Sequence, residues 1–332
     1  MDRVLRLHPG FATWRPCSSL VVVPGVASAP RTWLLAANLK RLNATEPCFK
    51  CVVFRQSHVG DKPELDSALE QSGVSRACEV IVSTNPEPAG YISHLKRVPP
   101  PLVEAGRFGF VFILLDDVEL TDSFDFALLR HLVAANRLSV VTPAVHNATI
   151  PSMLPHPLPT QALRSRPRGV GRLITRFEMF SVGFTPLAWR CFYALLDAAV
   201  NPIGWGYDSW QYDFCSRWPG LDHRVGVIDA MGAVHQPTRL LPPSPSSSAA
   251  AAPSDDARPG ARRAARKRRR AAKSGPRTIA NPEAGRTYST RIAHEQMDAM
   301  AAKWKARGVK LVEANYKLQK LPGPNGVVYM SE

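Results

Sequence analysis

Short apolar runs alternate with longer segments of helical periodicity between Leu20 and Val145. The runs are rich in Val, Ile and Phe and end at Gly, Pro or polar residues, which is typical of buried strands. They are Leu20–Val23, Cys51–Phe54, Val80–Val82, Phe108–Leu115 and Leu138–Thr142. Apolar residues at helical spacing predict helices over Arg31–Leu42 and Phe124–Ala135. This alternation predicts an α/β domain with a mainly parallel central sheet flanked by helices.

The pattern changes at Pro151–Pro167, which contains five prolines and predicts a long surface loop. Arg172–Phe184 is strand-like again. The dipeptide Thr185-Pro186 is a favourable helix start, and the apolar spacing that follows predicts a helix over Ala188–Ala199. Arg224–Asp229 is the last strand that we expect in this part of the chain.

The composition changes near the C-terminal end. Leu241–Asn281 consists mostly of Pro, Ser, Ala and Arg, which cannot build a core, so we expect disorder. Apolar positions in Thr290–Ala306 predict a helix with one buried face. We therefore expect a main domain over residues 17–240, a disordered basic insertion over 241–285, and a helical segment over 286–320 that packs on the main domain.

The N-terminus combines features of a signal peptide and of a strand. Three arginines in Met1–Arg15 precede an apolar stretch, and Ala27-Ser28-Ala29 resembles a cleavage site. The stretch is short and contains a proline, so we favour a first core strand over Ser19–Pro24. No run of uncharged apolar residues reaches the roughly 18 to 20 that a membrane-spanning helix needs. We expect no transmembrane segment.

The formal net charge of +15 is concentrated in one segment. Ten of the basic residues and no acid lie in Arg258–Arg277, which leaves +5 for the rest of the chain. The run Arg266–Arg270 would attract any polyanion, and it also fits a nuclear localisation signal or a solvated insert. No aromatic residue interrupts it, so base stacking is not indicated.

Six cysteines in 332 residues do not indicate a disulfide scaffold, and Cys48-x-x-Cys51 has no second pair that would complete a zinc site. We expect buried or loop thiols, and the redox compartment stays open. Two triplets, Asn43-Ala44-Thr45 and Asn147-Ala148-Thr149, are glycan acceptors if the chain enters the secretory route, although such triplets also occur by chance.

Two carboxylates end the apolar run Phe110–Leu115, namely Asp116 and Asp117. Open α/β sheets bind ligands at the carboxyl ends of their strands, and oxygen ligands in that position suit Mg²⁺ or Mn²⁺ on a diphosphate. The alternative is structural, with one acid capping a helix and the other solvated.

Several blocks resemble, in order and spacing, a poorly characterised family that is common in plants and is known as lysine-ketoglutarate reductase trans-splicing related. The pattern of this family is similar to that of glycosyltransferases of the GT-A fold. The resemblance covers roughly Cys17 to Gln236 and, more weakly, Glu295–Trp304. The family usually has Asp-Glu-Asp at the strand end, where this chain has Asp116-Asp117-Val118. The matching blocks are Lys96-Arg97, Phe177-Glu178-Met179-Phe180, Trp189-Arg190, Trp205-Gly206-x-Asp208, Gly226-Val227-Ile228-Asp229 and His235-Gln236.

The resemblance implies a GT-A-like domain and a role for each matching residue. Asp117, helped by Asp116, would hold a divalent cation (Mn²⁺ or Mg²⁺) on the diphosphate of a nucleotide-sugar, and His235 would complete the site. Asp208 is the candidate general base, or else a helix cap in an aromatic-rich turn. Trp205 and its neighbours Tyr207 and Trp210 could stack on a sugar ring.

Four further residues have weaker assignments. Glu178 would contact donor or acceptor, or form a buried hydrogen bond. Lys96 and Arg97 would meet phosphate, or coat a helix. Asp229 would orient His235 through a hydrogen bond.

Two functions of different classes follow. The first is a metal-dependent glycosyltransferase that moves a sugar from a nucleotide-diphosphate donor to a glycan or another hydroxyl acceptor. The second is a non-catalytic GT-A-like binding module whose basic insertion docks nucleic acid or an acidic partner. The missing third acid favours the second function, whereas the presence of Asp208, His235 and both strand-end aspartates favours the first. The resemblance and the two sequons suggest a Golgi or secretory address, although no clear signal peptide or membrane anchor is found.

Overall fold

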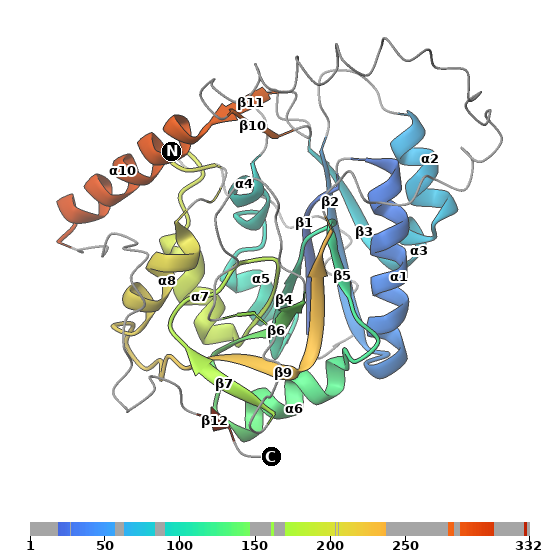
Figure 1. Ribbon diagram of the computed structural model, residues 1–332, viewed down its shortest axis with the longest axis horizontal. Coiled ribbons are helices and arrows are strands. Elements are labelled where there is room, and N and C mark those ends of the chain that lie inside the picture. Colours follow the sequence, from blue (N-terminus) through green and yellow to red (C-terminus); the bar gives the residue numbers. More distant parts are fainter. Residues whose placement is uncertain are drawn as a thin grey trace, which may run out of the picture.

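A computed structural model describes residues 19–26, 28–56, 63–83, 90–146, 161–162, 170–202, 204, 206–236, 278–281, 286–308 and 329–330. A curled sheet crosses the molecule, and helices cover both of its faces (Figure 1). The prediction of an α/β domain with a mainly parallel central sheet flanked by helices is confirmed.

Ten described strands form the main sheet in the order β12-β7-β9-β6-β8-β4-β1-β2-β3, and β5 pairs with β9 outside this order. Strands β1, β2, β3 and β4 are mutually parallel, and β9 is parallel to β6. Strand β8 is antiparallel to both β4 and β6 and joins the two parallel groups. The strands are β1 (Ser19–Val26), β2 (Phe49–Gln56), β3 (Glu79–Ser83), β4 (Phe110–Leu114), β5 (Val118–Leu120), β6 (Val140–His146), β7 (Gly171–Ile174), β8 (Ser181–Phe184), β9 (Val225–His235) and β12 (Tyr329–Met330).

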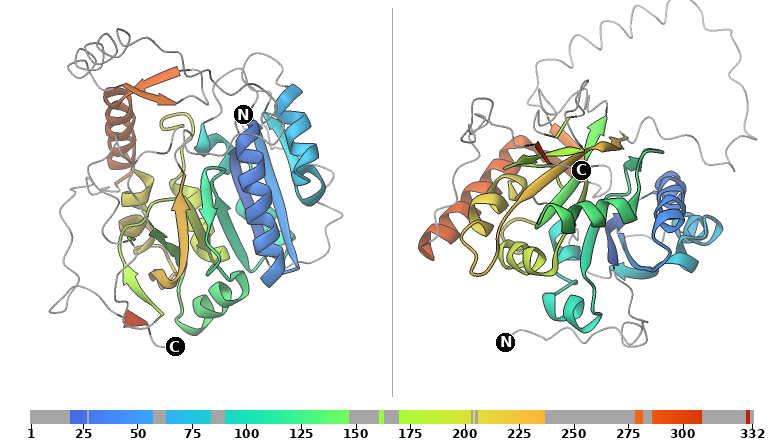
Figure 2. Two further views of the ribbon diagram at one scale, coloured as in Figure 1. Left: turned by 45° about the vertical axis from the view of Figure 1, so that its right-hand side comes forward. Right: turned by 90° about the horizontal axis from the view of Figure 1, so that it is seen from below.

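The helices divide between the two faces of the sheet (Figure 2). One face is covered by α1 (Ala29–Thr45), α2 (Pro63–Gln71), α3 (Val74–Ala77) and α6 (Phe126–Ala135). The other is covered by α4 (Tyr91–Leu95), α5 (Pro100–Ala105), α7 (Pro186–Leu195), α8 (Tyr207–Cys215) and α10 (Thr290–Ala306).

Alternation along the strands produces these two faces. In β1, Leu20 and Val22 pack into the core on the α7 side, whereas Val21 and Val23 pack into the core on the α1 side. Successive side chains of a strand point to opposite faces, so a strand buried on both sides is apolar throughout. This explains why the strands appear as continuous apolar runs in the sequence.

The structure differs from the expected elements in three places. The extended stretch Arg172–Phe184 is divided into β7 and β8 by a turn, and the last predicted strand continues to His235. Residues 278–281 form a strand, β10 (Thr278–Asn281), paired with β11 (Arg286–Ser289), so the prediction of disorder is wrong there. Residues 237–277, most of the predicted insertion, lie outside the described residues.

Helix α10 packs on α8. Met300 and Trp304 are buried, and the Trp304 ring meets the Phe214 ring edge-on with 4.9 Å between centroids. Lys303 forms an ion pair with Asp197. The domain boundaries stay predictions, because the chain between the sheet and the helix is only partly described.

The N-terminal strand is present as β1, while residues 1–18 lie outside the described residues. Among the helices that are described, none is long and apolar enough to cross a bilayer.

The expectation of free thiols is wrong. Disulfides join Cys51 to Cys78 and Cys191 to Cys215, and Cys48 is also disulfide-bonded. Every cysteine in the described part of the chain is therefore oxidised. No local pattern in the sequence indicates these bonds, because the partners are 27 and 24 residues apart and meet only after the helices have packed.

We expect the double substitution Cys191→Ala with Cys215→Ala to lower the free energy of unfolding by about 3 kcal/mol, because the unfolded chain regains the entropy of a closed loop. Urea denaturation of the oxidised protein measures this change. The Cys51→Ala and Cys78→Ala pair, which opens a loop of similar length, should cost a similar amount. An unchanged urea midpoint in both variants would contradict the assignment.

Two buried histidines are kept neutral by the core. Burial lowers the pKa of His94 to about 4, helped by the charge of Arg97 and opposed by a hydrogen bond to the Pro24 carbonyl. Burial also lowers the pKa of His223 to about 4 against the opposing charge of Asp222.

These two histidines should make the fold sensitive to acid. Their folded pKa lies below the unfolded value of 6.5, so the unfolded chain binds protons first. The free energy of unfolding should fall as pH drops from 6.5 to about 4, by on the order of 3 kcal/mol per histidine. Thermal melts across this pH range test the predicted loss of stability. His223→Gln should flatten the dependence.

Candidate functional site

The two strand-end acids lie where the predicted parallel sheet places them. Asp116 and Asp117 lie just beyond β4, separated from it by Leu115, at the edge where the parallel strands β1 and β4 have their carboxyl ends. His235, the last residue of β9, reaches the same point, with its Nε2 3.1 Å from Oδ2 of Asp117. The backbone N–H of Gln236 also donates to the Asp117 carbonyl at 2.7 Å.

The short strand β5 brings this acid and imidazole together. It pairs antiparallel with the end of β9, so that Val118 lies opposite His235. Helix α1 fixes β5 from the other side, because the Asn38 amide donates to the Val118 carbonyl at 2.5 Å and accepts from the Leu120 N–H at 2.9 Å. The contact therefore depends on three segments that are far apart in the sequence.

Arg31 is a part of this site that the sequence did not reveal. It lies in the first turn of α1, directly after β1, and its guanidinium donates to Asp116 at 2.9 Å and lies 3.6 Å from Asp117. Both Arg31 and Asp116 are buried. A buried carboxylate requires such a partner, so in this structure Asp116 anchors Arg31.

Charges around Asp117 and His235 shift both pKa values. Burial alone would raise the pKa of Asp117, but the hydrogen bond and charge of His235, with Arg31, lower it below its ordinary value. Burial lowers the pKa of His235, but Asp117 and Glu178 outweigh burial and raise it. The pair thus favours a carboxylate beside a protonated imidazole. The ring of Phe180 stacks on His235 with 4.3 Å between centroids.

Glu178 interacts electrostatically with both His235 and Asp208. The antiparallel strand β8 begins at the same sheet edge, which places the preceding residues beside the acids. Burial raises the pKa of Glu178 to about 7, with a further contribution from the charge of Asp208 against those of His235 and Arg176. Arg176 forms an ion pair with Asp208 at 3.2 Å.

Gly206 sets the start of the helix that carries Asp208. Its φ of 87° lies in the left-handed region, and a Cβ there would come within 2.9 Å of the Trp210 ring. Glycine is required for both reasons. The turn places Asp208 in the first turn of α8, where a negative charge is favourable.

The donor set at the strand end provides two groups for a metal. Oδ1 of Asp117 is buried and has no hydrogen-bond partner among the described residues, and His235 lies beside it. No group of three His, Cys, Asp or Glu side chains in the described part of the chain is arranged to hold a metal ion. Mg²⁺ and Mn²⁺ sites often use only one or two protein ligands and take the rest from phosphate and water, so this pair fits such a cation.

Other predicted site residues have different surroundings. Lys96 lies against α7, with its Nζ 3.7 Å from the centre of the Tyr193 ring. Arg97 follows it and is near His94. Trp205 lies outside the described residues.

Two assignments are wrong. Tyr207 and Trp210 are buried in the core, so neither offers a face for a sugar ring. Asp229 does not contact His235 but forms a fully buried ion pair with Arg172. The register between β6 and β9 shifts at this point, and the resulting bulge directs Asp229 away from the site.

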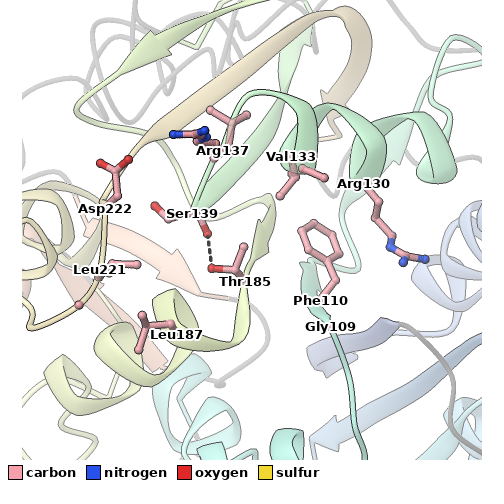
Figure 3. A pocket seen from close by; sticks show the side chains of 13 residues that line it. Gly109, Phe110, Arg130, Val133, Arg137, Ser139, Thr185, Leu187, Leu221 and Asp222 are labelled. Carbon is pink, nitrogen blue, oxygen red and sulfur yellow. Dashed lines mark hydrogen bonds between the residues drawn. The ribbon is translucent and has the colours of Figure 1, made fainter.

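A pocket of about 450 Å³ lies at the other edge of the sheet, near the amino ends of β4 and β6 (Figure 3). Phe110, Val133 and Leu187 line it, with the exposed Arg137 and Asp222 at its rim. None of the predicted site residues lines this pocket.

Comparisons with known proteins give only distant likenesses. No family model and no curated protein matches the chain. Among solved structures, one match is GalNAc-T7 with UDP, GalNAc and Mn²⁺. The alignment covers 67% of this chain and 44% of the GalNAc-T7 chain, at 11% identity and a TM-score of 0.46. Residues 1–349 of S. aureus TarS align over 66% and 60%, at 9% identity and a TM-score of 0.39.

A third structure, mannose-1-phosphate geranyltransferase from Thermus thermophilus, aligns over 67% of this chain and 75% of its own, at 12% identity and a TM-score of 0.32. The chain spans less than two thirds of the length of GalNAc-T7 and of the TarS fragment. Likenesses this distant do not identify what this chain binds or transfers.

We expect Asp116→Ala to lower the free energy of unfolding by about 3 kcal/mol, because it leaves the buried Arg31 without its main partner. Adding Arg31→Met to the Asp116→Ala variant should recover most of the lost free energy of unfolding. Urea denaturation of the single and double variants gives the coupling energy. Asp122→Ala, which removes an exposed acid paired with Arg41, should change stability by less than about 1 kcal/mol. Equal effects at both acids would contradict the anchoring role.

Proposed function

We propose that this chain is a GT-A-like glycosyltransferase that moves a sugar from a nucleotide-diphosphate donor to a hydroxyl acceptor. One observation carries the proposal: Asp117 and His235 are in contact at the carboxyl edge of the sheet, with an unsatisfied carboxylate oxygen on Asp117. Structural acids and histidines are normally satisfied by their neighbours, so an unsatisfied pair at this edge is better explained by a ligand. The resemblance to the trans-splicing-related family agrees with it.

A divalent cation, Mn²⁺ or Mg²⁺, would be held by Asp117 and by His235 in its neutral form, so that the imidazole would release its extra proton to solvent on metal binding. When bound, it neutralises charge that develops on the departing diphosphate. Asp116 has a different task in this proposal, because it fixes Arg31, whose guanidinium adds positive charge beside Asp117. The missing third acid is then less important than the family pattern suggests, since His235 supplies the second ligand.

Asp208 is our candidate for the base on the acceptor side. The acceptor oxygen bonds to the anomeric carbon of the sugar, the bond from that carbon to the diphosphate oxygen breaks, and the diphosphate leaves with the electron pair. The acceptor proton passes to a carboxylate. Glu178 is the second candidate, because it lies in electrostatic range of both Asp208 and His235 and burial raises its pKa to about 7. Asp208, by contrast, is held in an ion pair with Arg176.

The alternative, a binding module without catalysis, predicts that the basic insertion docks nucleic acid or an acidic partner and that no nucleotide-sugar is consumed. Its main feature is the basic run Arg266–Arg270, which lies outside the described residues. The two functions differ in one measurable way, because only the enzyme consumes a nucleotide-sugar.

The first test is thermal stability of the purified protein with Mn²⁺ and a panel of nucleoside diphosphates and nucleotide-sugars. A ligand at a hundredfold excess over its Kd adds about 2.7 kcal/mol to the free energy of unfolding, so a donor should produce a clear rise in Tm. Asp117→Ala and His235→Ala should abolish the rise. Asp122→Ala, which removes an exposed acid that pairs with Arg41 and not with the strand-end acids, should retain it.

Turnover then separates the two candidate bases. With a donor identified, Asp208→Asn or Glu178→Gln should reduce kcat by roughly 100-fold or more while the Tm shift is preserved, and the residue with the larger effect is the base. If no nucleotide shifts Tm, or if Asp117→Ala shifts it as wild type does, the transferase proposal fails. Donor binding without turnover in the presence of a broad acceptor panel would favour the binding module.

A further inference from the structure

The oxidation state of the cysteines points to the compartment in which the chain folds. All five cysteines of the described part are in disulfides, and the two pairs that are fully described are buried. Disulfides of this kind form and persist in secretory compartments and on the outside of cells, whereas cytosolic thiols are kept reduced. Because the two described pairs tie different helices and strands, they are part of the frame of the fold.

Asn43 offers an acceptor for a glycan in such a compartment. It begins the triplet Asn43-Ala44-Thr45 in the last turn of α1, and both Asn43 and Ala44 are exposed. The Asn43 side chain makes no hydrogen bond within the described part of the chain. Thr45 is different, because its hydroxyl accepts the N–H of Phe126 at 2.9 Å and so helps to begin α6.

The position of Asn43 is compatible with the candidate site. It lies twelve residues after Arg31 on the same helix, which is about 18 Å along the axis at 1.5 Å per residue. The start of α1 is at the carboxyl edge of the sheet beside Asp116, and its end is at the opposite edge. Because Asn43 is exposed and lies at the end of α1 that is remote from Asp116, a bulky group on it would leave the strand-end acids accessible.

We propose that Asn43 carries an N-linked oligosaccharide, attached in the oxidising compartment where the disulfides form. In the attachment, Nδ2 of Asn43 forms a bond to the anomeric carbon of a lipid-linked oligosaccharide. The bond between that carbon and the pyrophosphate oxygen breaks, the lipid pyrophosphate leaves with the electron pair, and the amide loses one proton. The proposal rests on the disulfides and on Asn43 and is independent of the proposed transferase activity.

The test uses the native protein isolated from the cells that make it. After treatment with peptide N-glycosidase in H₂¹⁸O, the peptide that contains position 43 should carry an ¹⁸O-labelled aspartate in place of Asn43. Labelling of the denatured, unreduced protein with a maleimide reagent should add no mass at Cys51, Cys78, Cys191 or Cys215. An unmodified Asn43 peptide, or maleimide on these cysteines, would overturn the proposal.

Variants of the full chain, expressed with a secretory leader in eukaryotic cells, identify the acceptor. Asn43→Gln should remove one glycan from the electrophoretic pattern and leave Tm close to that of the deglycosylated wild type, because this side chain has no partner to lose. Thr45→Ser, which keeps the triplet and the hydroxyl, should retain the glycan. Asn147→Gln tests the second triplet, Asn147-Ala148-Thr149, independently of the first. A pattern that changes only with Asn147→Gln would overturn the assignment to Asn43.

Discussion

The buried carboxylate of Asp116, just beyond the end of β4, is the constraint on which the site depends. Asp116 is shielded from water and cannot remain ionised without a cation in contact. Arg31 supplies it at 2.9 Å, and the first turn of α1 must therefore lie directly against the end of β4. This contact fixes the helix, the strand and the loop between β1 and α1 relative to one another, and it leaves Asp117 as the acid that faces outward.

The remaining geometry follows from how β9 ends. A bulge shifts its register against β6, and beyond the bulge the last residues of β9 stay paired with β6 on one side and pair with β5 on the other. His235 is carried to Asp117 by this change, and Asn38 holds β5 from the opposite side. The same bulge buries Asp229 against Arg172. On β9, Asp229 thus lies at the bulge and has a structural role, whereas His235 lies beyond it and belongs to the candidate site.

The acceptor side of the site depends on the packing of helices. Asp208 stands in the first turn of α8, and a disulfide between Cys191 and Cys215 ties the end of α8 to α7. Helix α10, from the C-terminal part of the chain, packs on the same helix through Trp304. Residues that are predicted to touch substrate are therefore positioned by elements that have no part in the chemistry, which makes the covalent frame relevant to the site.

The strands of the sheet and the acids at the end of β4 could be predicted from the amino-acid pattern alone. Continuous apolar runs are required when a strand is covered on both faces, and the acids after Phe110–Leu115 mark its carboxyl end whatever surrounds them. The partners of those acids were decided only in three dimensions. Neither the contact of Arg31 with Asp116 nor the disulfides leaves a periodic or local signal, because each joins positions that are distant along the chain. The partner of Asp116 and the disulfide pairing follow from burial and from long-range contacts, which exist only in the packed molecule.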